Sequence, residues 1–147
     1  MKIRPAAVII ENNRVLLLRY SYGGTTVYQF PGGNIEEAET MEQTLSRELL
    51  EELTLPIKVG RLYLSAQVIN NKKKQATLHC LFEGKILNAS KPTINPEETS
   101  AIEVVWMEMN QLAQLNLYPS VGAALVEISK AGTYENNYLG EINQPWF

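Results

Sequence analysis

The stretch RELLEELTL, at residues 47–55, decides the fold of this chain. Glu48, Glu51 and Glu52 are spaced i, i+3 and i+4, so a helix places their three carboxylates on one face. The leucines of the same segment recur every fourth residue and mark the buried face: Leu45, Leu49 and Leu53. The pattern therefore predicts an amphipathic helix with an acidic cluster on its outer face.

Three acids in one helical turn need a reason beyond folding. Like charges at these spacings repel each other by about 0.2–0.5 kcal/mol per pair. Glu51 and Glu52 also lie in the last turn, where the helix dipole disfavours anions. A hard divalent cation supplies the reason, because magnesium binds clustered carboxylate oxygens. The sequence predicts a Mg²⁺ site here, in which Mn²⁺ can substitute.

The acidic stretch also lies at fixed distances from two earlier residues. Five residues separate Gly33 from Glu39, and seven separate Glu39 from the start of the stretch. This spacing resembles the signature box of the Nudix hydrolases, and the preceding FPGG at residues 30–33 resembles its usual lead-in. The residues that fill the box are Gly33, Glu39, Arg47, Glu48, Leu49, Glu51, Glu52 and Leu55.

One position departs from the box. Thr54 stands where the family has Gly, which ends a helix readily because it adopts φ > 0 without strain. We therefore expect the helix to have a shifted or reshaped end, with no acidic position affected.

The resemblance implies a fold, an activity and a ligand set. The implied fold is an α/β Nudix fold, a single domain over residues 1–147 with a mixed β-sheet between helices in an α/β/α sandwich. The implied activity is that of a pyrophosphohydrolase, which cleaves the diphosphate linkage of a small nucleotide with Mg²⁺. The Gly33 carbonyl, Glu48, Glu51 and Glu52 are expected around the metals, and Glu48 is either a ligand or the base that takes a proton from water.

The resemblance gives two further box residues a positioning role. Arg47 is expected to be largely buried, to point away from Glu48 and to pair with Glu39. This pairing would pin the Gly33 loop to the helix, so that the Gly33 carbonyl faces the metal. The absence of a side chain at Gly32 and Gly33 lets the backbone approach the ligands closely.

Many Nudix enzymes take a further acid, as a metal ligand or general base, from a loop before a late strand. Glu98 is the first choice for this role, and Glu97 and Glu103 stay open. The alternative for each is a solvated acid at the entrance of a strand.

Two residues are candidates for contact with the substrate. Tyr28 offers an aromatic face on which a nucleobase can stack, and Tyr20 and Tyr22 are weaker candidates for the same role. Arg19 is expected to clamp a phosphate. The alternatives are a half-buried strand tyrosine and a surface ion pair.

The composition fits a compact cytoplasmic enzyme. The 147 residues are 45% hydrophobic and 20% charged, which is ordinary for a globular protein with a buried core. The lone cysteine, Cys80, allows no internal disulfide and is expected to be a buried hydrophobe. No apolar run has the length of a membrane span, and no signal peptide is expected. A net charge of −3 argues against a nucleic-acid partner.

The rest of the chain has one continuous α/β pattern. A hairpin is expected at residues 11–14, and His79 is expected to be a structural histidine with satisfied hydrogen bonds. The tail from residue 133 has no clear period, but its aromatic pairs favour packing onto the domain or onto a partner, so a homodimer stays open. Strands are expected over residues 6–10, 15–20, 27–30, 57–70, 75–87 and 102–109, and helices over about 40–53 and 119–130.

Three alternative functions stay open beside this hydrolase. A catalytically silent nucleotide-binding module predicts a broken acid set, whereas every acid is present. An RNA 5′-end pyrophosphohydrolase predicts a basic groove or an added RNA-binding region, and an isomerase-like relative of the fold remains a further alternative. The sequence does not identify the leaving group, so nucleoside triphosphates, ADP-ribose, other nucleotide sugars and dinucleoside polyphosphates are all compatible.

Overall fold

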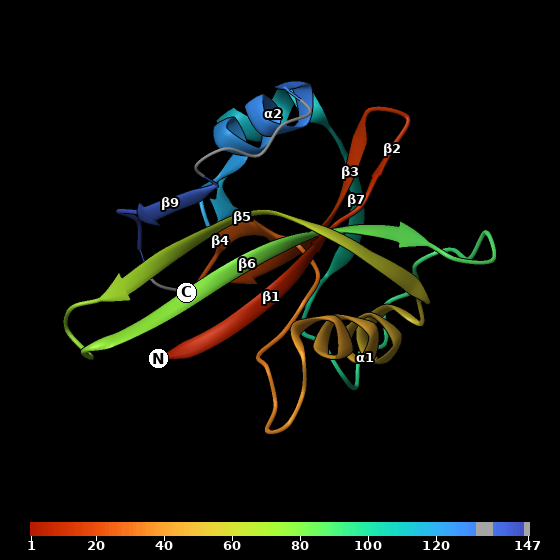
Figure 1. The fold of residues 1–147 in the computed structure, drawn as a ribbon, viewed down its shortest axis with the longest axis horizontal. Helices are drawn as coiled ribbons and strands as arrows, with labels where there is room; N and C mark the ends of the chain where they lie inside the picture. Colours follow the sequence, from red (N-terminus) through yellow and green to blue (C-terminus); the bar gives the residue numbers. More distant parts are fainter. Residues whose placement is uncertain (132–136, 146–147) are drawn as a thin grey trace.

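In the computed structural model, which describes residues 1–131 and 137–145, two helices enclose the strands from opposite sides (Figure 1). This arrangement confirms the predicted α/β/α sandwich. The elements are β1 (Lys2–Val8), β2 (Ile10–Glu11), β3 (Arg14–Tyr22), β4 (Thr25–Gln29), α1 (Met41–Leu53), β5 (Ile57–Asn70), β6 (Gln75–Ile86), β7 (Glu103–Glu108), the 3₁₀ helix η1 (Met109–Gln114), β8 (Leu117–Tyr118), α2 (Gly122–Ala131) and β9 (Tyr138–Glu141).

The strands divide between two mixed sheets. One has the order β1-β6-β5-β9, and the other has the order β2-β3-β4-β8 with β7 paired to β3. The β1/β6, β4/β8 and β5/β9 pairs are parallel, whereas the long β5/β6 and β3/β4 pairs are antiparallel. Mixed pairing is as predicted, but two sheets take the place of the single expected one.

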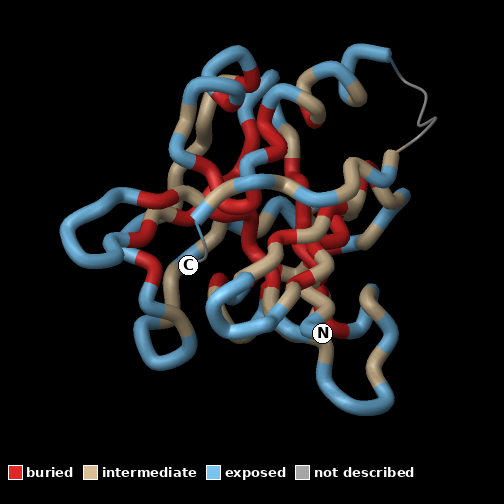
Figure 2. The backbone as a smooth tube through the Cα atoms, turned by 90° about the vertical axis from the view of Figure 1, so that its left-hand side faces the viewer, coloured by how far each residue is buried: buried red, intermediate tan, exposed pale blue. Residues whose placement is uncertain are grey.

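Two buried clusters hold the layers together (Figure 2). The first joins the leucine face of α1 to β1 and β3, for example through Leu49 and Leu16. The second joins α2 and η1 to both sheets, for example through Leu125, Leu17 and Leu64. Successive residues of β3 enter different clusters, because side chains of a strand alternate between its two faces.

Helix α1 has the boundaries that its sequence predicts. Thr40 caps it, because the Thr40 hydroxyl accepts from the Gln43 N–H at 3.1 Å and the Gln43 side chain accepts from the Thr40 N–H at 2.9 Å. The buried face consists of Thr44, Leu45, Leu49 and Leu53. Burial of this face turns Glu48, Glu51 and Glu52 away from the leucine cluster.

The expected shift of the helix end at Thr54 is wrong. Thr54 itself adopts the left-handed conformation, with φ 52° and ψ 36°. Its N–H donates to the Leu50 carbonyl at 3.0 Å, and the Leu55 N–H donates to the Leu49 carbonyl at 3.1 Å. The helix therefore ends as a glycine-terminated helix does, and Thr54 bears a backbone cost of about 1 kcal/mol.

Several boundaries in the rest of the chain differ from expectation. The predicted hairpin exists, but it joins β2 to β3, while β1 begins at Lys2 and pairs with β6 in the other sheet. Helix α2 begins at Gly122, where a Cβ atom would lie 2.3 Å from the Leu112 carbonyl oxygen of η1. Both η1 and β8 lacked a sequence signal strong enough to predict them.

The C-terminal tail packs onto the domain, which is one of the two alternatives that the sequence predicted. Strand β9 pairs with β5, and Leu139 packs against the cluster under α2. Trp146 and Phe147, the second aromatic pair of the prediction, lie outside the described residues.

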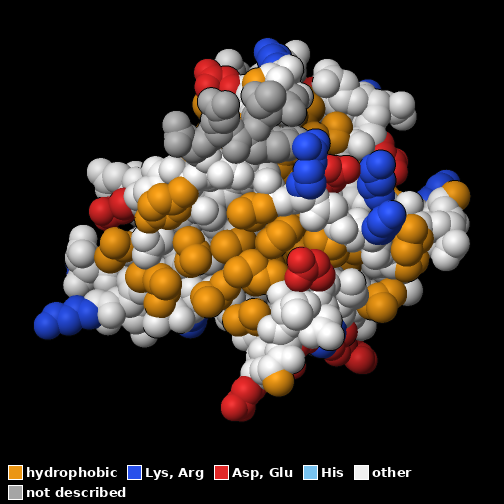
Figure 3. Space-filling view, in the orientation of Figure 1, with side chains coloured by type: hydrophobic (Ala, Val, Ile, Leu, Met, Phe, Trp, Pro, Cys, Tyr) orange, Lys and Arg blue, Asp and Glu red, His pale blue; other side chains and the backbone are white. Residues whose placement is uncertain are grey.

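The surface carries charges of both signs, in keeping with the small net charge of −3. On the face seen in Figure 3, apolar side chains gather over the middle of the β1-β6-β5 sheet, and charged side chains lie mainly around them. Within the described part of the chain, no helix has the length and apolar character needed to cross a membrane.

Candidate active site

A single guanidinium joins α1 to the loop that precedes it. Arg47 donates from Nε to Glu39 Oε2 at 2.8 Å and from Nη2 to Glu39 Oε1 at 3.0 Å, so the predicted pairing of these residues is confirmed. The Glu39 carboxylate also accepts from the Glu36 N–H and the Thr44 hydroxyl. The Arg47 hydrogen bond is the main reason why the pKa of Glu39 falls to about 2.

The prediction that Arg47 points away from Glu48 is wrong. The third nitrogen, Nη1, donates to Glu48 Oε1 at 3.0 Å and to Glu51 Oε2 at 3.2 Å. The bidentate pair with Glu39 uses only two nitrogens of the fork, which leaves Nη1 facing the acids of the same helix. The Arg47 side chain is 22% exposed, so most of it is buried, as the sequence analysis expected.

This geometry predicts that Arg47→Ala lowers stability and activity together. The change leaves Glu36, Glu39, Glu48 and Glu51 without the cation they share, and it releases the Gly33 loop from α1. We expect the melting temperature to fall by roughly 5 °C and turnover to fall at least about tenfold.

Arg14→Ala is the matched control for this prediction. Arg14 forms one ion pair, with Glu108, in which both side chains are well exposed, so its loss should shift the melting temperature by at most about 2 °C. Equal melting temperatures for the two variants, measured by calorimetry, would reject the structural role of Arg47.

The glycine pair allows close approaches that side chains would block. A Cβ atom on Gly33 would lie 2.3 Å from the carboxyl carbon of Glu48, and one on Gly32 would lie 2.3 Å from the Pro5 carbonyl oxygen. The loop is held in place along β1, where the Ala7 N–H donates to the Pro31 carbonyl at 2.8 Å. The backbone of Gly33 therefore borders the Glu48 carboxylate, as the sequence analysis expected.

Glu48 and Glu52 form a close pair of carboxyl groups. Burial of Glu52, followed by the nearby charge of Glu48, raises the pKa of Glu52 to about 8. Glu48 also makes a side-chain hydrogen bond with Glu52, and its own side chain is only 15% exposed. Two carboxyl groups held together in this way favour the binding of either a proton or a cation.

The loop with the two candidate late acids is tied to the end of α1. The Asn95 N–H donates to the Glu52 carbonyl at 2.8 Å, and the Thr93 N–H donates to the Leu53 carbonyl at 2.9 Å. These bonds satisfy carbonyls that the helix end leaves unpaired. The loop thus brings Glu97 and Glu98, both exposed, toward the end of the helix that carries Glu52.

The other predicted site residues lie on strands β3, β4 and β7. Arg19 and Tyr28 are register partners across β3 and β4. Arg19 donates from Nε to Glu103 at 2.6 Å, which matches the surface ion pair named as the alternative for Arg19. Tyr28 is half-buried against the cluster under α2. The substrate contacts predicted for Arg19 and Tyr28 stay predictions.

Two of the predicted metal ligands, Glu48 and Glu52, offer oxygen atoms that suit a hard divalent cation. Glu48 and Glu52 offer carboxylate oxygens beside the Gly33 backbone, and hard cations prefer such ligands. Glu48 and Glu51 both accept from Arg47 Nη1, at 3.0 Å and 3.2 Å, so each has one oxygen engaged by Arg47. No three His, Cys, Asp or Glu side chains of the described residues are arranged as a metal site. Glu48 and Glu52 would hold the metal, because their carboxyl groups lie together and Glu48 lies against the Gly33 backbone.

A model of the NUDIX domain family matches residues 1–126 of this chain, a range that includes the whole acidic helix and its brace. The chain belongs to the Nudix family. The predicted Nudix-type hydrolase is thereby confirmed at the level of the family. No curated protein matches the sequence.

Solved structures of Nudix proteins share the fold. The E. coli ORF135 protein is 23% identical, with a TM-score of 0.71 over 89% of both chains. A NUDIX hydrolase from Nitrosomonas europaea is 21% identical, with a TM-score of 0.72 over 99% of this chain and 97% of that one. An ADP-ribose pyrophosphatase from Streptococcus suis is 16% identical, with a TM-score of 0.65 over 95% of this chain and 97% of that one.

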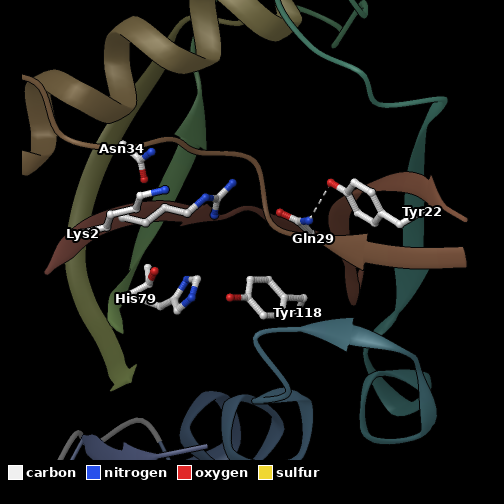
Figure 4. Close-up of a pocket in the computed structure, with 8 residues that line it drawn as sticks. Lys2, Tyr22, Gln29, Asn34, His79 and Tyr118 are labelled. Carbon is white, nitrogen blue, oxygen red and sulfur yellow. Dashed lines mark hydrogen bonds between the residues drawn. The ribbon is translucent and has the colours of Figure 1, made fainter. Parts of the chain in front are cut away.

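This Nudix chain also has a polar pocket that the sequence analysis missed (Figure 4). The pocket lies between the two sheets, next to the Gly33 loop from which Asn34 reaches its rim. Arg4, which lines it, donates from Nη2 to the Gly32 carbonyl at 3.4 Å and is close enough to Glu52 to lower the pKa of that acid. The alternation of Lys2 and Arg4 in an otherwise apolar strand was the available signal.

Proposed function

We propose that the chain is a divalent-metal-dependent hydrolase that cleaves the diphosphate linkage of a small nucleotide. The observation that carries this proposal is the Glu48–Glu52 carboxyl pair: Glu48 lies against the Gly33 backbone, and burial together with the Glu48 charge raises the pKa of Glu52. Such a pair destabilises the metal-free site, and a bound cation relieves the repulsion. When bound, Mg²⁺ neutralises phosphate charge and activates water for attack on phosphorus.

The residues of the chain have distinct roles in this proposal. Glu52 is a metal ligand, and Glu48 either shares that role or takes the proton of the attacking water. Glu51 and Glu98 are further ligands, and the Gly33 carbonyl completes the set. Arg47 and Glu39 position the loop and the helix without contacting the substrate.

The substrate enters from the side of the polar pocket in this proposal. Lys2 and Arg4 line the pocket, and among the residues that the structure describes no carboxylate lines it, so the approach to the acidic cluster is locally cationic. A cationic approach suits a nucleotide, whose phosphates are anionic. Arg19 and Tyr28 remain proposed contacts for phosphate and nucleobase. A cytoplasmic location and a homodimer remain proposals as well.

A panel of nucleotides tests the proposed function. Nucleoside triphosphates, ADP-ribose, UDP-sugars and dinucleoside polyphosphates are incubated with the protein and Mg²⁺, and released nucleoside monophosphate, phosphate and pyrophosphate are quantified. ADP-ribose and UDP-sugars are included because neighbouring structures carry the names ADP-ribose pyrophosphatase and UDP-X diphosphatase. We expect one class to be hydrolysed well above the others.

The same panel run with Glu52→Gln protein, purified in the same way, controls for contaminating phosphatases. Hydrolysis that is equal in both preparations, or absent for every nucleotide with both Mg²⁺ and Mn²⁺, would contradict the proposed function.

A further inference from the structure

The polar pocket is built from facing strands of the two sheets. In one wall, Arg4 of β1 is the register partner of His79 of β6, so their side chains share one face. In the other wall, Gln29 of β4 is the register partner of Tyr118 of β8. Figure 4 shows the His79 ring beside the Tyr118 hydroxyl, and the pocket that both residues line has a volume of about 180 Å³.

Polar atoms of this pocket are buried without partners. His79 is fully buried, yet neither of its ring nitrogens has a hydrogen-bond partner, so the expected satisfied histidine is wrong in this respect. Arg4 Nη1 is also buried and unpartnered, and within residues 1–131 and 137–145 these three atoms are the only such side-chain atoms. Buried polar atoms are normally satisfied, so their gathering in one cavity points to a ligand that satisfies them.

The two side chains define what the ligand must offer. Burial, and secondarily the Arg4 charge, lowers the pKa of His79 to about 3, so the ring is neutral and has one donor and one acceptor nitrogen. Arg4 has donors only, so it requires an acceptor such as a carbonyl oxygen. The ring of Tyr118, whose centroid lies 5.2 Å from that of His79, adds an aromatic surface for a flat group.

We propose that this pocket binds a carbonyl-bearing nucleobase of the substrate through Arg4 and His79, and thereby discriminates against adenine. This inference rests on the proposed hydrolysis of a nucleotide. Guanine, cytosine, uracil and thymine all carry a carbonyl oxygen next to a ring nitrogen, which suits the Arg4 donor beside the donor and acceptor of His79. Adenine has no carbonyl and presents an amino group where guanine and thymine present an acceptor oxygen.

His79→Phe tests the proposal with little disturbance of the fold. The change keeps a ring of similar size against Tyr118 and removes two nitrogens that have no partners, so the melting temperature should stay equal or rise. For the preferred nucleotide we expect kcat/KM to fall at least about tenfold, mainly through KM, because each lost hydrogen bond to the base weakens binding. The preference for that nucleotide over ATP should fall by a similar factor.

Leu78→Thr is the matched control, because Leu78 is the neighbouring residue of β6 and faces the opposite side of the sheet. It should leave the preference over ATP unchanged. Arg4→Gln should also reduce the preference. If Arg4→Gln instead lowers kcat/KM by the same factor for the nucleotides of guanine, cytosine, uracil and adenine, Arg4 contacts phosphate and the proposal is overturned.

A binding measurement separates this inference from the hydrolytic activity. In excess chelator, GMP, CMP and UMP should raise the melting temperature of the wild-type protein more than AMP does, and His79→Phe should remove the difference. Equal shifts for all four nucleotides, or a preference for AMP or ATP, would overturn the proposed base specificity while leaving the proposed function intact. Base-dependent binding without hydrolysis of any nucleotide would overturn the proposed function alone.

Discussion

Replacing Glu52 by glutamine lowers the turnover of the best nucleotide substrate at least about a hundredfold, while the fold survives. Glutamine keeps the size of the side chain and removes the charge that a metal ion needs. Helix α1 is held by its cap and its leucine face, neither of which involves Glu52. The measurement is kcat at saturating nucleotide and Mg²⁺, with Glu42→Gln as control, because Glu42 is an exposed acid in the first turn of the same helix.

The same substitution has a second effect, on the stability of the metal-free protein. The pKa of Glu52 is about 8 in the folded state and near its ordinary value of 4.5 in the unfolded state. Between these pH values the folded state binds more protons, so the stability of the wild-type protein falls as pH rises from about 4.5 to about 8. Glutamine does not titrate, so the melting temperature of Glu52→Gln should exceed that of wild type at pH 8 in chelator.

The turnover measurement and the melting measurement each test a separate part of the role assigned to Glu52. Near wild-type turnover of Glu52→Gln would remove Glu52 from the active site. Melting temperatures that differ from wild type by the same amount at pH 5 and pH 8 would show that neither burial nor the Glu48 charge raises the pKa of Glu52.

Removal of divalent metal should abolish turnover completely, and Mg²⁺ or Mn²⁺ should restore it. The reason is that, without a cation, nothing in the acidic cluster neutralises the phosphate charge of a nucleotide or activates the attacking water. The measurement is turnover in excess chelator, followed by titration with each metal. Undiminished turnover in the chelator would reject the metal-dependent reaction.

Metal binding should also stabilise the folded protein. Mg²⁺ at about 100 times its dissociation constant adds about 2.7 kcal/mol, because it binds the folded state only. The Glu48→Gln and Glu52→Gln variants should lose most of this stabilisation, whereas Arg14→Ala, which lies in an exposed ion pair, should keep it.

Much of the site could be predicted from one helix. The spacing of the leucines and the acids fixes which side of α1 is buried, and the Thr40 and Pro56 signals fix where it lies in the chain. The pairing of Arg47 with Glu39 followed from the resemblance to the Nudix box. The additional contacts of Arg47 with Glu48 and Glu51 could not be predicted in this way, because they depend on how the three nitrogens of one guanidinium are shared among several acids.

Thr54 shows the limit of arguing from backbone preference. The sequence alone favoured a shifted helix end, because threonine resists φ > 0. The structure keeps the end in place, since Leu53 and Leu55 are both fully buried on either side of Thr54. Burial of two leucines is worth several kcal/mol, which exceeds the cost of about 1 kcal/mol for one left-handed residue.

The sequence by itself determined the acidic helix, its cap and the family of the chain. These depend on spacings within about 25 residues, and the geometry of one helix and its loop sets where residues at such spacings lie. Only the tertiary structure decided the polar pocket. Arg4 and His79 become neighbours through the parallel pairing of β1 with β6, and they face Gln29 and Tyr118 from another sheet. Strand pairing across such distances in the chain is set by burial of whole sheet faces, and no local pattern in the sequence encodes it.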